Sequence, residues 1–350
     1  MPDQSRQTDG VLIMTIHSKK YASLTPLHLC DCIVRQLESK GIPLEDTILG
    51  SGLRSDDFNI PSRMLDLQQE QQIIRNALRL SDDPLLGLNL GRSARISAYG
   101  LLGYAMLTAP TLRAGLEIPM RLPALLGTYF QLGIYSSDGM VQIRAENCRA
   151  PADLEPILTE LCLVSFKTLI EDMLLRSVSL MGVAFRYGPL CELDIYESAF
   201  GCDVYFDADV SSISLDAKLL DEILPLANSL CHQKVIDLCQ NQNRELVSNR
   251  EWLEKLRNIL SENLVNPPDL ESLAEKMHCS PRTLRRQLQD QNTSYRQLLD
   301  ELRFTKAKSL LGSHSGTVDQ IAEELGFSDG AGLRRAFRRW CGMSPNAFRT

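Results

Sequence analysis

Apolar residues in the last hundred positions recur every three or four residues, in short runs separated by polar residues and turn formers. This period is typical of amphipathic helices. It predicts helices over about residues 252–264, 270–277, 281–289, 294–311 and 317–325, and a last helix that includes residues 333–340. Asn266-Pro267-Pro268 ends the first of these helices and Gly326 ends the fifth.

Helix-start signals stand in front of three of these segments. Asp269 can cap the second segment, and Ser280 followed by Pro281 opens the third. Thr317 and Gln320 form a capping box at the start of the fifth. The chain is therefore expected to end in an all-α domain.

The first 250 residues mix helical and strand patterns. Helical spacing covers residues 68–80, 156–176 and about 219–249, and the last stretch is expected to lead into the C-terminal domain. Strand-like alternation covers residues 178–187 and 203–206, and a hairpin is predicted over 134–143 around Asp138-Gly139. No linker rich in Pro, Gly or Ser is visible. We predict a flexible N-terminal segment (residues 1–20), an α+β domain (21–245) and an all-α domain (246–350).

A short helix, a tight turn and a second short helix occur twice in the C-terminal part. The two copies are LESLAEKMHCSPRTLRRQLQ, which starts at Leu270, and VDQIAEELGFSDGAGLRRAFRRW, which starts at Val318. In a helix-turn-helix the second helix enters the major groove of DNA. A single match is weak, but two in tandem, each basic on its second helix, indicate a DNA-binding domain.

The second helix of each copy separates apolar from polar residues. Leu284 and Leu288 face inward in the first copy, and Leu333 and Phe337 do so in the second. On the opposite faces, Arg can bind guanine edges and phosphates, and Gln can pair with adenine. A solvated basic surface is the plain alternative for one such helix alone. The predicted DNA contacts are Ser280, Arg282, Thr283, Arg285, Arg286, Gln289, Ser328, Gly332, Arg334, Arg335, Arg338 and Arg339.

The charge is distributed unevenly along the chain. The whole chain has a formal net charge of -7, yet residues 281–350 hold 12 Lys and Arg against 7 Asp and Glu. A basic end on an acidic protein is typical of a region that meets an anion. The hydrophobic content of 44% is too high for a disordered chain and is typical of a globular protein.

Nothing in the sequence indicates catalysis, a metal or a cofactor. Phosphate-binding, nucleophile-elbow and zinc-protease motifs are absent, and the glycine-bearing loops expected at 49–52 and 87–91 follow no strand. The histidines before residue 250, which are His17, His28 and His232, are expected to be surface or packed residues. The ten cysteines contain no Cys-x-x-Cys pair and are expected to be reduced thiols. We predict no enzyme, no cofactor and no metal site.

Secretion and membrane insertion are also disfavoured. The apolar run at residues 11–16 is too short for a signal peptide. The longest uncharged stretch lies between Arg95 and Arg113 and contains two glycines and a proline, which favours buried core over a membrane span. We expect a cytoplasmic protein without a membrane partner.

Residues 270–350 resemble the DNA-binding domain of AraC/XylS-type bacterial transcription regulators. The blocks Gly326-Phe327-Ser328-Asp329 and Gly342-Met343-Ser344-Pro345 carry much of the resemblance. It implies two helix-turn-helix subdomains joined by a long helix, with the two recognition helices in successive major grooves on one face of the duplex.

The family's base-reading positions map onto both recognition helices. In the first helix they are Arg282, Arg285 and Arg286, and in the second they are Gly330, Ala331, Gly332 and Arg335. The second set departs from the family, which usually carries polar side chains at that helix start. His278 is another departure, because the first turn usually has glycine there.

Residues 21–245 resemble, more loosely, the arabinose-binding-type N-terminal domain of one branch of these regulators, a mixed α+β module rather than a cupin barrel. The segments DDPLLGLNLG and YGLLGYAMLTAPTLRAGL carry this resemblance. It implies a sensor and dimerisation domain, and hence an effector-responsive activator that binds double-stranded DNA as a homodimer and contacts RNA polymerase.

Two alternatives remain at this point. The N-terminal domain could serve dimerisation alone and bind no ligand, or it could be an enzyme fused to a DNA-binding tail. An effector pocket would be lined by aromatic and methionine side chains, with ordinary core packing as the plain alternative. The candidates are Tyr99, Tyr104, Met106, Tyr129, Phe130, Phe185 and Tyr187.

Overall fold

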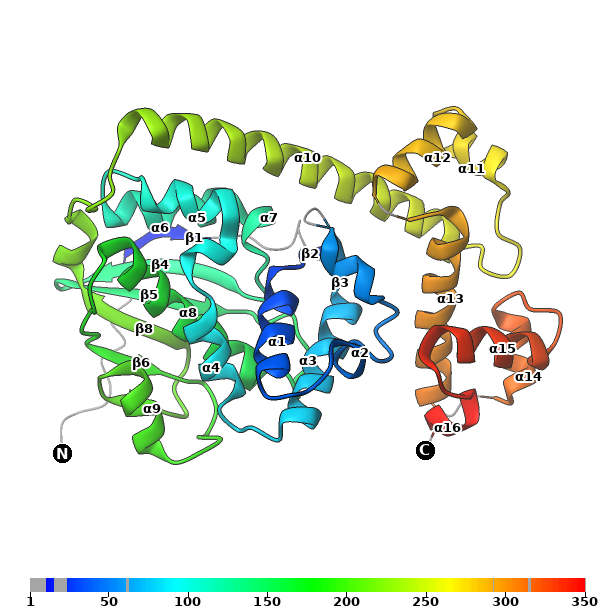
Figure 1. The fold of residues 1–350 in the computed structure, drawn as a ribbon, viewed down its shortest axis with the longest axis horizontal. Coiled ribbons are helices and arrows are strands. Elements are labelled where there is room, and N and C mark those ends of the chain that lie inside the picture. Colours follow the sequence, from blue (N-terminus) through cyan, green and yellow to red (C-terminus); the bar gives the residue numbers. More distant parts are fainter. Residues whose placement is uncertain (1–10, 16–23, 61–62, 292, 314–315, 350) are drawn as a thin grey trace.

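A mixed α+β domain and a helical domain are joined along one long helix (Figure 1). The computed structural model describes residues 11–15, 24–60, 63–291, 293–313 and 316–349. The α+β domain precedes the all-α domain, so the predicted order of fold classes is confirmed. His17 and most of the predicted flexible segment lie outside the described residues.

A six-stranded sheet forms the centre of the N-terminal domain, in the order β1-β4-β5-β8-β6-β7. All neighbouring strands are antiparallel except β6 and β7, and β2 and β3 form a separate antiparallel pair. The strands are β1 (Val11–Thr15), β2 (Leu24–Pro26), β3 (Met64–Asp66), β4 (Gln131–Ser137), β5 (Met140–Glu146), β6 (Gly182–Ala184), β7 (Val204–Tyr205) and β8 (Ser211–Asp216).

The predicted hairpin is confirmed as β4 and β5. Asp138 and Gly139 have φ angles of 49° and 78°, the left-handed pair that a two-residue hairpin turn requires. One prediction of flexible chain and one strand prediction need correction. The apolar run at residues 11–15 is strand β1 rather than flexible chain, because its backbone pairs with β4. Of residues 178–187, only Gly182–Ala184 form a strand.

Helices cover the sheet and fill the rest of the N-terminal domain. They are α1 (His28–Ser39), α2 (Leu44–Thr47), η2 (Ser55–Asn59), α3 (Leu67–Ser81), α4 (Leu86–Ser93), η3 (Ile96–Tyr99), α5 (Gly100–Leu107), α6 (Leu112–Arg121), α7 (Pro123–Leu126), α8 (Glu155–Leu174), α9 (Leu193–Phe200) and η4 (Ala217–Asp221). The helices predicted over 68–80 and 156–176 are thus confirmed as α3 and α8.

Helix α4 packs closely against α8 through two glycines. A Cβ atom on Gly87 would lie 2.8 Å from the carbonyl oxygen of Ile157, and one on Gly91 would lie 2.6 Å from Cβ of Val164. The expectation of a loop at 87–91 is therefore wrong. The glycines lie inside a helix because the neighbouring backbone leaves no room for a side chain.

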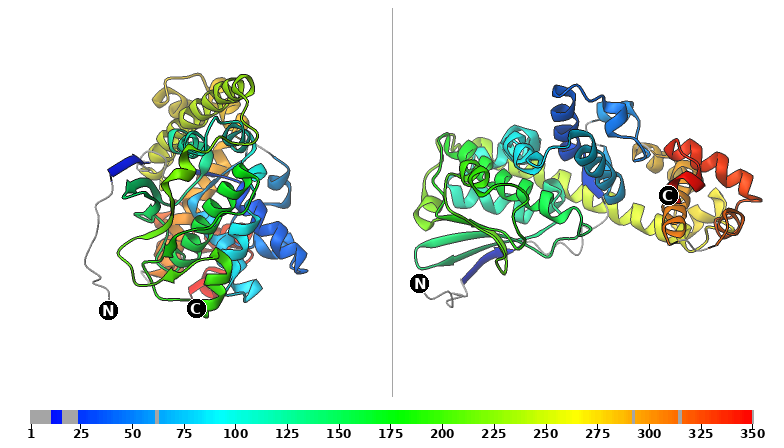
Figure 2. Two further views of the ribbon diagram at one scale, coloured as in Figure 1. Left: turned by 90° about the vertical axis from the view of Figure 1, so that its left-hand side faces the viewer. Right: turned by 90° about the horizontal axis from the view of Figure 1, so that it is seen from below.

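Helix α10 (Ser229–Ser261) runs for 33 residues along the N-terminal domain and into the C-terminal one (Figures 1 and 2). Val235 and Cys239 are buried in the N-terminal core, whereas Leu256 and Leu260 are buried in the C-terminal domain. The helix starts later than the predicted residue 219, because Asn228 caps it by accepting from the Cys231 N–H at 3.0 Å. The predicted boundary at 245/246 falls inside this continuous helix.

The C-terminal domain contains two small cores. The first is built by α10, α11 (Leu270–Lys276), α12 (Pro281–Asp290) and the start of α13 (Tyr295–Gly312). The second is built by the rest of α13 with α14 (Val318–Glu324), α15 (Gly330–Cys341) and α16 (Pro345–Arg349). Helix α13 thus joins two helix-turn-helix subdomains, and α12 and α15 lie toward its opposite ends (Figure 1).

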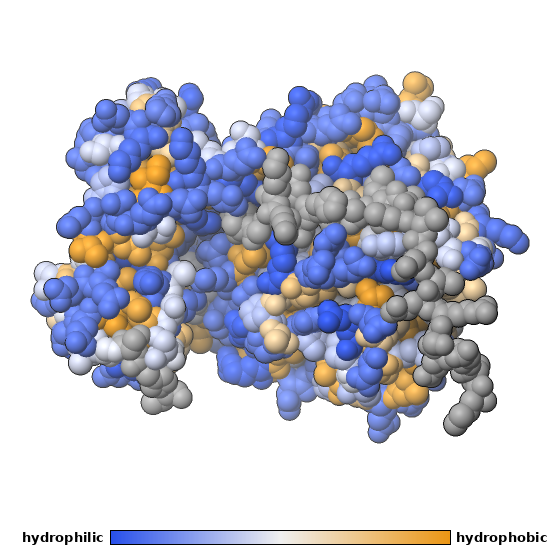
Figure 3. Space-filling model, turned by 180° about the vertical axis from the view of Figure 1, so that it is seen from behind, coloured by the Kyte–Doolittle hydropathy of each residue, from blue (hydrophilic) through white to orange (hydrophobic). Residues whose placement is uncertain are grey.

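Polar side chains also link the two domains beside the core of α10. Arg257 on α10 lies 3.2 Å from Glu301 on α13 and 4.0 Å from Asp66 of β3. The hydroxyl of Thr305 donates to the Gln68 side chain at 3.1 Å. The face in Figure 3 is covered mainly by hydrophilic residues, with apolar residues in small separate groups over both domains.

Candidate nucleic-acid interface

The first helix-turn-helix consists of α11 and α12. Asp269 caps α11 by accepting from the Ser272 N–H at 2.9 Å, and Ser280 caps α12 by accepting from the Thr283 N–H at 3.1 Å. His278 in the turn has a φ angle of 53°, which histidine tolerates at moderate cost. The turn therefore keeps its left-handed residue without glycine.

The exposed face of α12 carries the predicted base-reading residues. Leu284 and Leu288 are buried, while Arg282, Arg285, Arg286 and Gln289 are exposed and Thr283 is half-buried. Within the residues that the structure describes, none of these three arginines forms an ion pair with a carboxylate. No acidic residue lies in the first turn of α12. This face can accept an anionic partner without first breaking internal salt bridges.

The second helix-turn-helix consists of α14 and α15. Thr317 and Gln320 form the predicted capping box, with hydrogen bonds of 2.7 and 3.2 Å. Gly326 in the turn has a φ angle of 73°, and a Cβ atom there would lie 2.3 Å from the carbonyl oxygen of Val265. Both the backbone angle and the space require glycine at this position.

Two carboxylates occupy the N-terminus of α15. The cap is Asp329, and its carboxylate accepts from the Gly332 N–H at 2.6 Å. Asp319 of α14 accepts from the Gly330 N–H at 3.0 Å. A Cβ atom on residue 330 would lie 2.0 Å from Asp319 Oδ1, so glycine is needed there for the carboxylate to fit. The first N–H groups of α15, which could otherwise bind a phosphate, are thus bound by the protein's own acidic groups.

The four arginines of α15 are all exposed, but they differ in their partners. Arg339 lies 3.0 Å from Asp300 on α13, and Arg334 lies 3.8 Å from Asp319. In the described parts of the chain, Arg335 and Arg338 form no ion pair. Asp300, Asp319 and Asp329 were missed by sequence reasoning. Asp329 alone had a local signal, its position three residues before Gly332 at a helix start.

The candidate effector residues do not share one pocket. Tyr99, Tyr129 and Phe130 line a cavity of about 60 Å³. Met106 is buried in the core, and Tyr104 is 49% exposed. Such a cavity is small compared with metabolite sites of several hundred Å³.

Phe185 and Tyr187 belong to a separate aromatic cluster. Phe185 stacks on Phe206 with ring centroids 5.4 Å apart, and its centroid lies 5.3 Å from that of Tyr187. The Tyr196 ring meets both Phe185 and Phe206 edge-on. These rings fill the space between them, as core side chains do.

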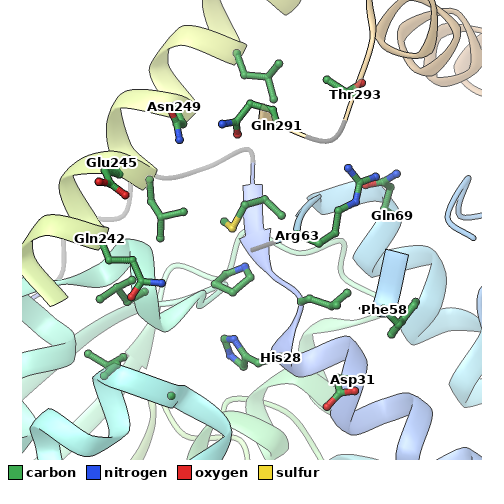
Figure 4. Close-up of a pocket in the computed structure, with 18 of the residues that line it drawn as sticks. His28, Asp31, Phe58, Arg63, Gln69, Gln242, Glu245, Asn249, Gln291 and Thr293 are labelled. Carbon is green, nitrogen blue, oxygen red and sulfur yellow. The ribbon is translucent and has the colours of Figure 1, made fainter. Parts of the chain in front are cut away.

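Larger cavities lie between the domains, and of the seven candidate effector residues Tyr99 lines one of them. One, of about 570 Å³, is lined by residues of α1, α10 and the α12–α13 connection (Figure 4). The other, of about 650 Å³, reaches from the α2–α3 region to α13 and the end of α15. Arg63, Gln69 and Glu301 line both.

Burial changes the titration of several groups in the N-terminal domain. It lowers the pKa of His28, which lines the cavity of about 570 Å³, to about 4, so this imidazole is neutral at pH 7. It raises the pKa of Glu70 and of Glu160 to about 7. Burial also raises the pKa of Glu301, although Arg257 acts in the opposite direction.

Neither a metal site nor a membrane span emerges from the described residues. No group of three or more His, Cys, Asp or Glu side chains there is arranged to hold a metal ion. All helices in the described part of the chain are too short or too polar to cross a bilayer. The ten cysteines are free thiols.

Two family descriptions match this chain. The arabinose-binding domain of AraC transcription regulators matches residues 41–224, and a helix-turn-helix domain matches residues 273–350. Among named proteins, the Ornithine utilization regulator of Pseudomonas aeruginosa is 26% identical over 332 residues, covering 94% of this chain and 97% of that protein. The HTH-type transcriptional regulator VqsM of the same organism is 29% identical over 278 residues, covering 75% and 83%. The solved structure of CdpR from Pseudomonas aeruginosa aligns with a TM-score of 0.46 at 23% identity, covering 92% of this chain and 98% of that one.

Proposed function

This chain belongs to the AraC family of transcription regulators and is a DNA-binding regulator, and we propose that its two recognition helices contact DNA differently. Helix α12 reads base edges, and α15 holds the phosphate backbone. The observation that carries this proposal is the contrast between their N-termini. The start of α12 is free of acidic residues, whereas the first N–H groups of α15 are bound to Asp329 and Asp319.

Helix α12 has the side chains for direct readout. Arg282, Arg285 and Arg286 can each bind guanine or phosphate, and Gln289 can pair with adenine. The N-terminus of α12, capped by Ser280, can also accept a phosphate because helix N-termini attract anions.

Helix α15 has fewer means of reading bases. Ala331 and Gly332 bring no polar side chain to the helix start, and the carboxylates of Asp319 and Asp329 repel phosphate there. Arg335 and Arg338 remain as cations without an internal ion pair within the described residues. Arg338 supplies a sequence-independent phosphate contact, whereas Arg335 holds the one base-reading position of this helix that has a polar side chain.

Arginine-to-alanine variants separate these two roles. Arg285→Ala should cost about 1–3 kcal/mol of binding free energy on the operator and relax specificity at one base pair. Arg338→Ala should weaken binding to all sequences alike and reduce the slope of log affinity against log salt by about 0.9. Arg339→Ala is the matched control, with a smaller expected effect because Asp300 already binds that guanidinium.

Fluorescence anisotropy on an operator found by genome-wide binding mapping measures these effects. A set of operators with single base-pair changes supplies the specificity profile, and two or more salt concentrations supply the slope. If Arg285→Ala and Arg338→Ala both bind every sequence as the wild type does, the assignment of the recognition helices is wrong.

The N-terminal domain is proposed to sense a small molecule and to dimerise, so that the protein acts in the cytoplasm as an activator that contacts RNA polymerase. The interdomain cavities and the arabinose-binding-type match support a ligand. One relative is named for ornithine utilization, which makes a nitrogenous metabolite the first class to test. Sedimentation measures the dimer. A protein that dimerises but responds to no metabolite would favour a domain for dimerisation alone, and substrate turnover by the chain would favour an enzyme.

A further inference from the structure

The cavity of about 570 Å³ lies where the N-terminal domain meets the first helix-turn-helix subdomain. Its volume falls within the range of roughly 300–1,000 Å³ that is usual for small-molecule sites. In Figure 4, Gln242, Glu245 and Asn249 lie along α10, and Gln291 and Thr293 lie across from them. The cavity is therefore bordered by both domains.

Amide side chains provide much of its polar lining. Gln242 and Asn249 come from α10, and Gln291 follows the end of α12. An amide offers both donors and acceptors, so these groups can bind a polar ligand without demanding a charge of either sign. Leu246 and Leu253 add an apolar strip along α10, suited to a short aliphatic chain.

The arginines that line the cavity are each beside a carboxylate. The pairs are Arg35 with Asp31 at 2.8 Å, Arg63 with Asp57 at 3.3 Å and Arg257 with Glu301 at 3.2 Å. His28 adds no charge at pH 7, because burial lowers its pKa to about 4. The positive charge of the lining is thus already balanced.

Two lining carboxylates have no such partner. Neither Glu245 on α10 nor Asp290 at the end of α12 forms an ion pair with any residue that the structure describes. Both are exposed to solvent in the structure. The uncompensated charge in the cavity is negative, which favours a cation and disfavours an anion.

We propose that this interdomain cavity binds a small aliphatic amine, with Glu245 and Asp290 as its counter-charges and Gln242, Asn249 and Gln291 as its hydrogen-bond partners. The proposal rests on the effector-sensing role given above and names the site and the chemical class of the ligand. An amine that bridges α10 and the end of α12 attaches the first recognition helix to the N-terminal domain. Because the two binding events are linked, amine binding at the cavity then changes the affinity of the protein for DNA.

Three four-carbon compounds of matched length test the charge assignment: 1,4-diaminobutane, 1,4-butanediol and succinate. Isothermal titration of the full-length protein in an amine-free phosphate buffer at pH 7 should show binding of 1,4-diaminobutane and at least about tenfold weaker binding of the other two. Glu245→Gln and Asp290→Asn should each weaken diamine binding by about fivefold. Glu251→Gln, an exposed carboxylate elsewhere on α10 that does not line the cavity, should leave it unchanged.

DNA binding by the same protein preparations is measured separately, by titration with the operator duplex. This measurement tests the proposed function independently of the amine site. DNA binding without any diamine binding overturns the amine site and leaves the regulator assignment in place. Equal binding of the diol or of succinate overturns the charge assignment. Diamine binding that both Glu245→Gln and Asp290→Asn leave unchanged overturns the location.

Discussion

Glu160 makes the stability of the folded protein depend on pH. Its side chain is fully buried on α8, where it accepts a hydrogen bond from the Tyr196 hydroxyl. Helix α4 closes the other side, since a Cβ atom on Gly87 would lie 2.6 Å from Glu160 Oε2. No cation pairs with this carboxylate in the described structure. Burial therefore raises the pKa of Glu160 from 4.5 to about 7, with the Tyr196 hydrogen bond acting against it.

The sign and size of the effect follow from proton linkage. The folded state keeps the proton up to about pH 7, whereas the unfolded chain loses it near pH 4.5. The folded state thus binds more protons in this window, and the free energy of unfolding falls as pH rises through it. At about 1.4 kcal/mol per pH unit, the total loss is about 3 kcal/mol and is complete above about pH 7.

Glu160→Gln should remove this contribution, because the amide oxygen can still accept from Tyr196 but carries no charge. We expect the variant and the wild type to have similar stability near pH 5, and the variant to be more stable by up to about 3 kcal/mol at pH 8.5. Urea unfolding followed by circular dichroism at several pH values measures the difference. Glu70 titrates in the same window, but it is present in both proteins and cancels.

Glu197→Gln is the matched control, because it removes an exposed carboxylate from α9, the helix that carries Tyr196. Its stability profile should run parallel to that of the wild type. If the Glu160→Gln profile also runs parallel to the wild type between pH 5 and 8.5, Glu160 is not kept protonated by burial and the reasoning fails.

Two further substitutions probe the second helix-turn-helix. Gly326→Ala should lower the free energy of unfolding by about 2 kcal/mol or more, because the residue has a φ angle of 73° and its Cβ would meet the carbonyl oxygen of Val265 at 2.3 Å. Chemical denaturation measures this, and an unchanged free energy of unfolding would contradict it. The double variant Ala331→Gln and Gly332→Thr should add sequence preference in the second half-site, because it places polar side chains at the start of α15, where Ala331 is exposed. A Cβ on residue 332 would lie 3.3 Å from Asp329 Oδ1, so this capping side chain must shift slightly. Selection from a randomised duplex library measures the sequence preference, and a change in affinity without a change in preference would count against backbone-only contact by α15.

The sequence was sufficient to predict an element where residues close to one another in the chain stabilise it. The caps Asp269, Ser280 and Thr317 each bind an N–H three residues later, so the helix starts could be predicted. Asp329 caps α15 in the same way, with its carboxylate bound to the Gly332 N–H.

Long-range contacts account for the predictions that failed or were missing. The seven candidate effector residues are aromatic or apolar in sequence, yet Tyr99 lines a cavity while Phe185 fills a core. The Asp300–Arg339 pair joins residues 39 positions apart, and the Asp319–Gly330 bond fixes how the start of α15 can be used. Contacts of this kind depend on how two helices cross in space, and the spacing of residues along the sequence does not determine that.

The sequence by itself determined the helices of the C-terminal domain, their order and the face on which the arginines lie, because helical period and capping act within a few residues. It also determined the family. Only the tertiary structure decided which arginines have acidic partners, why residues 87, 91 and 330 must be glycine, and that the larger cavities lie between domains. These features arise where segments distant in sequence are brought together, since a carboxylate, a backbone or a cavity wall acts on its neighbours in space.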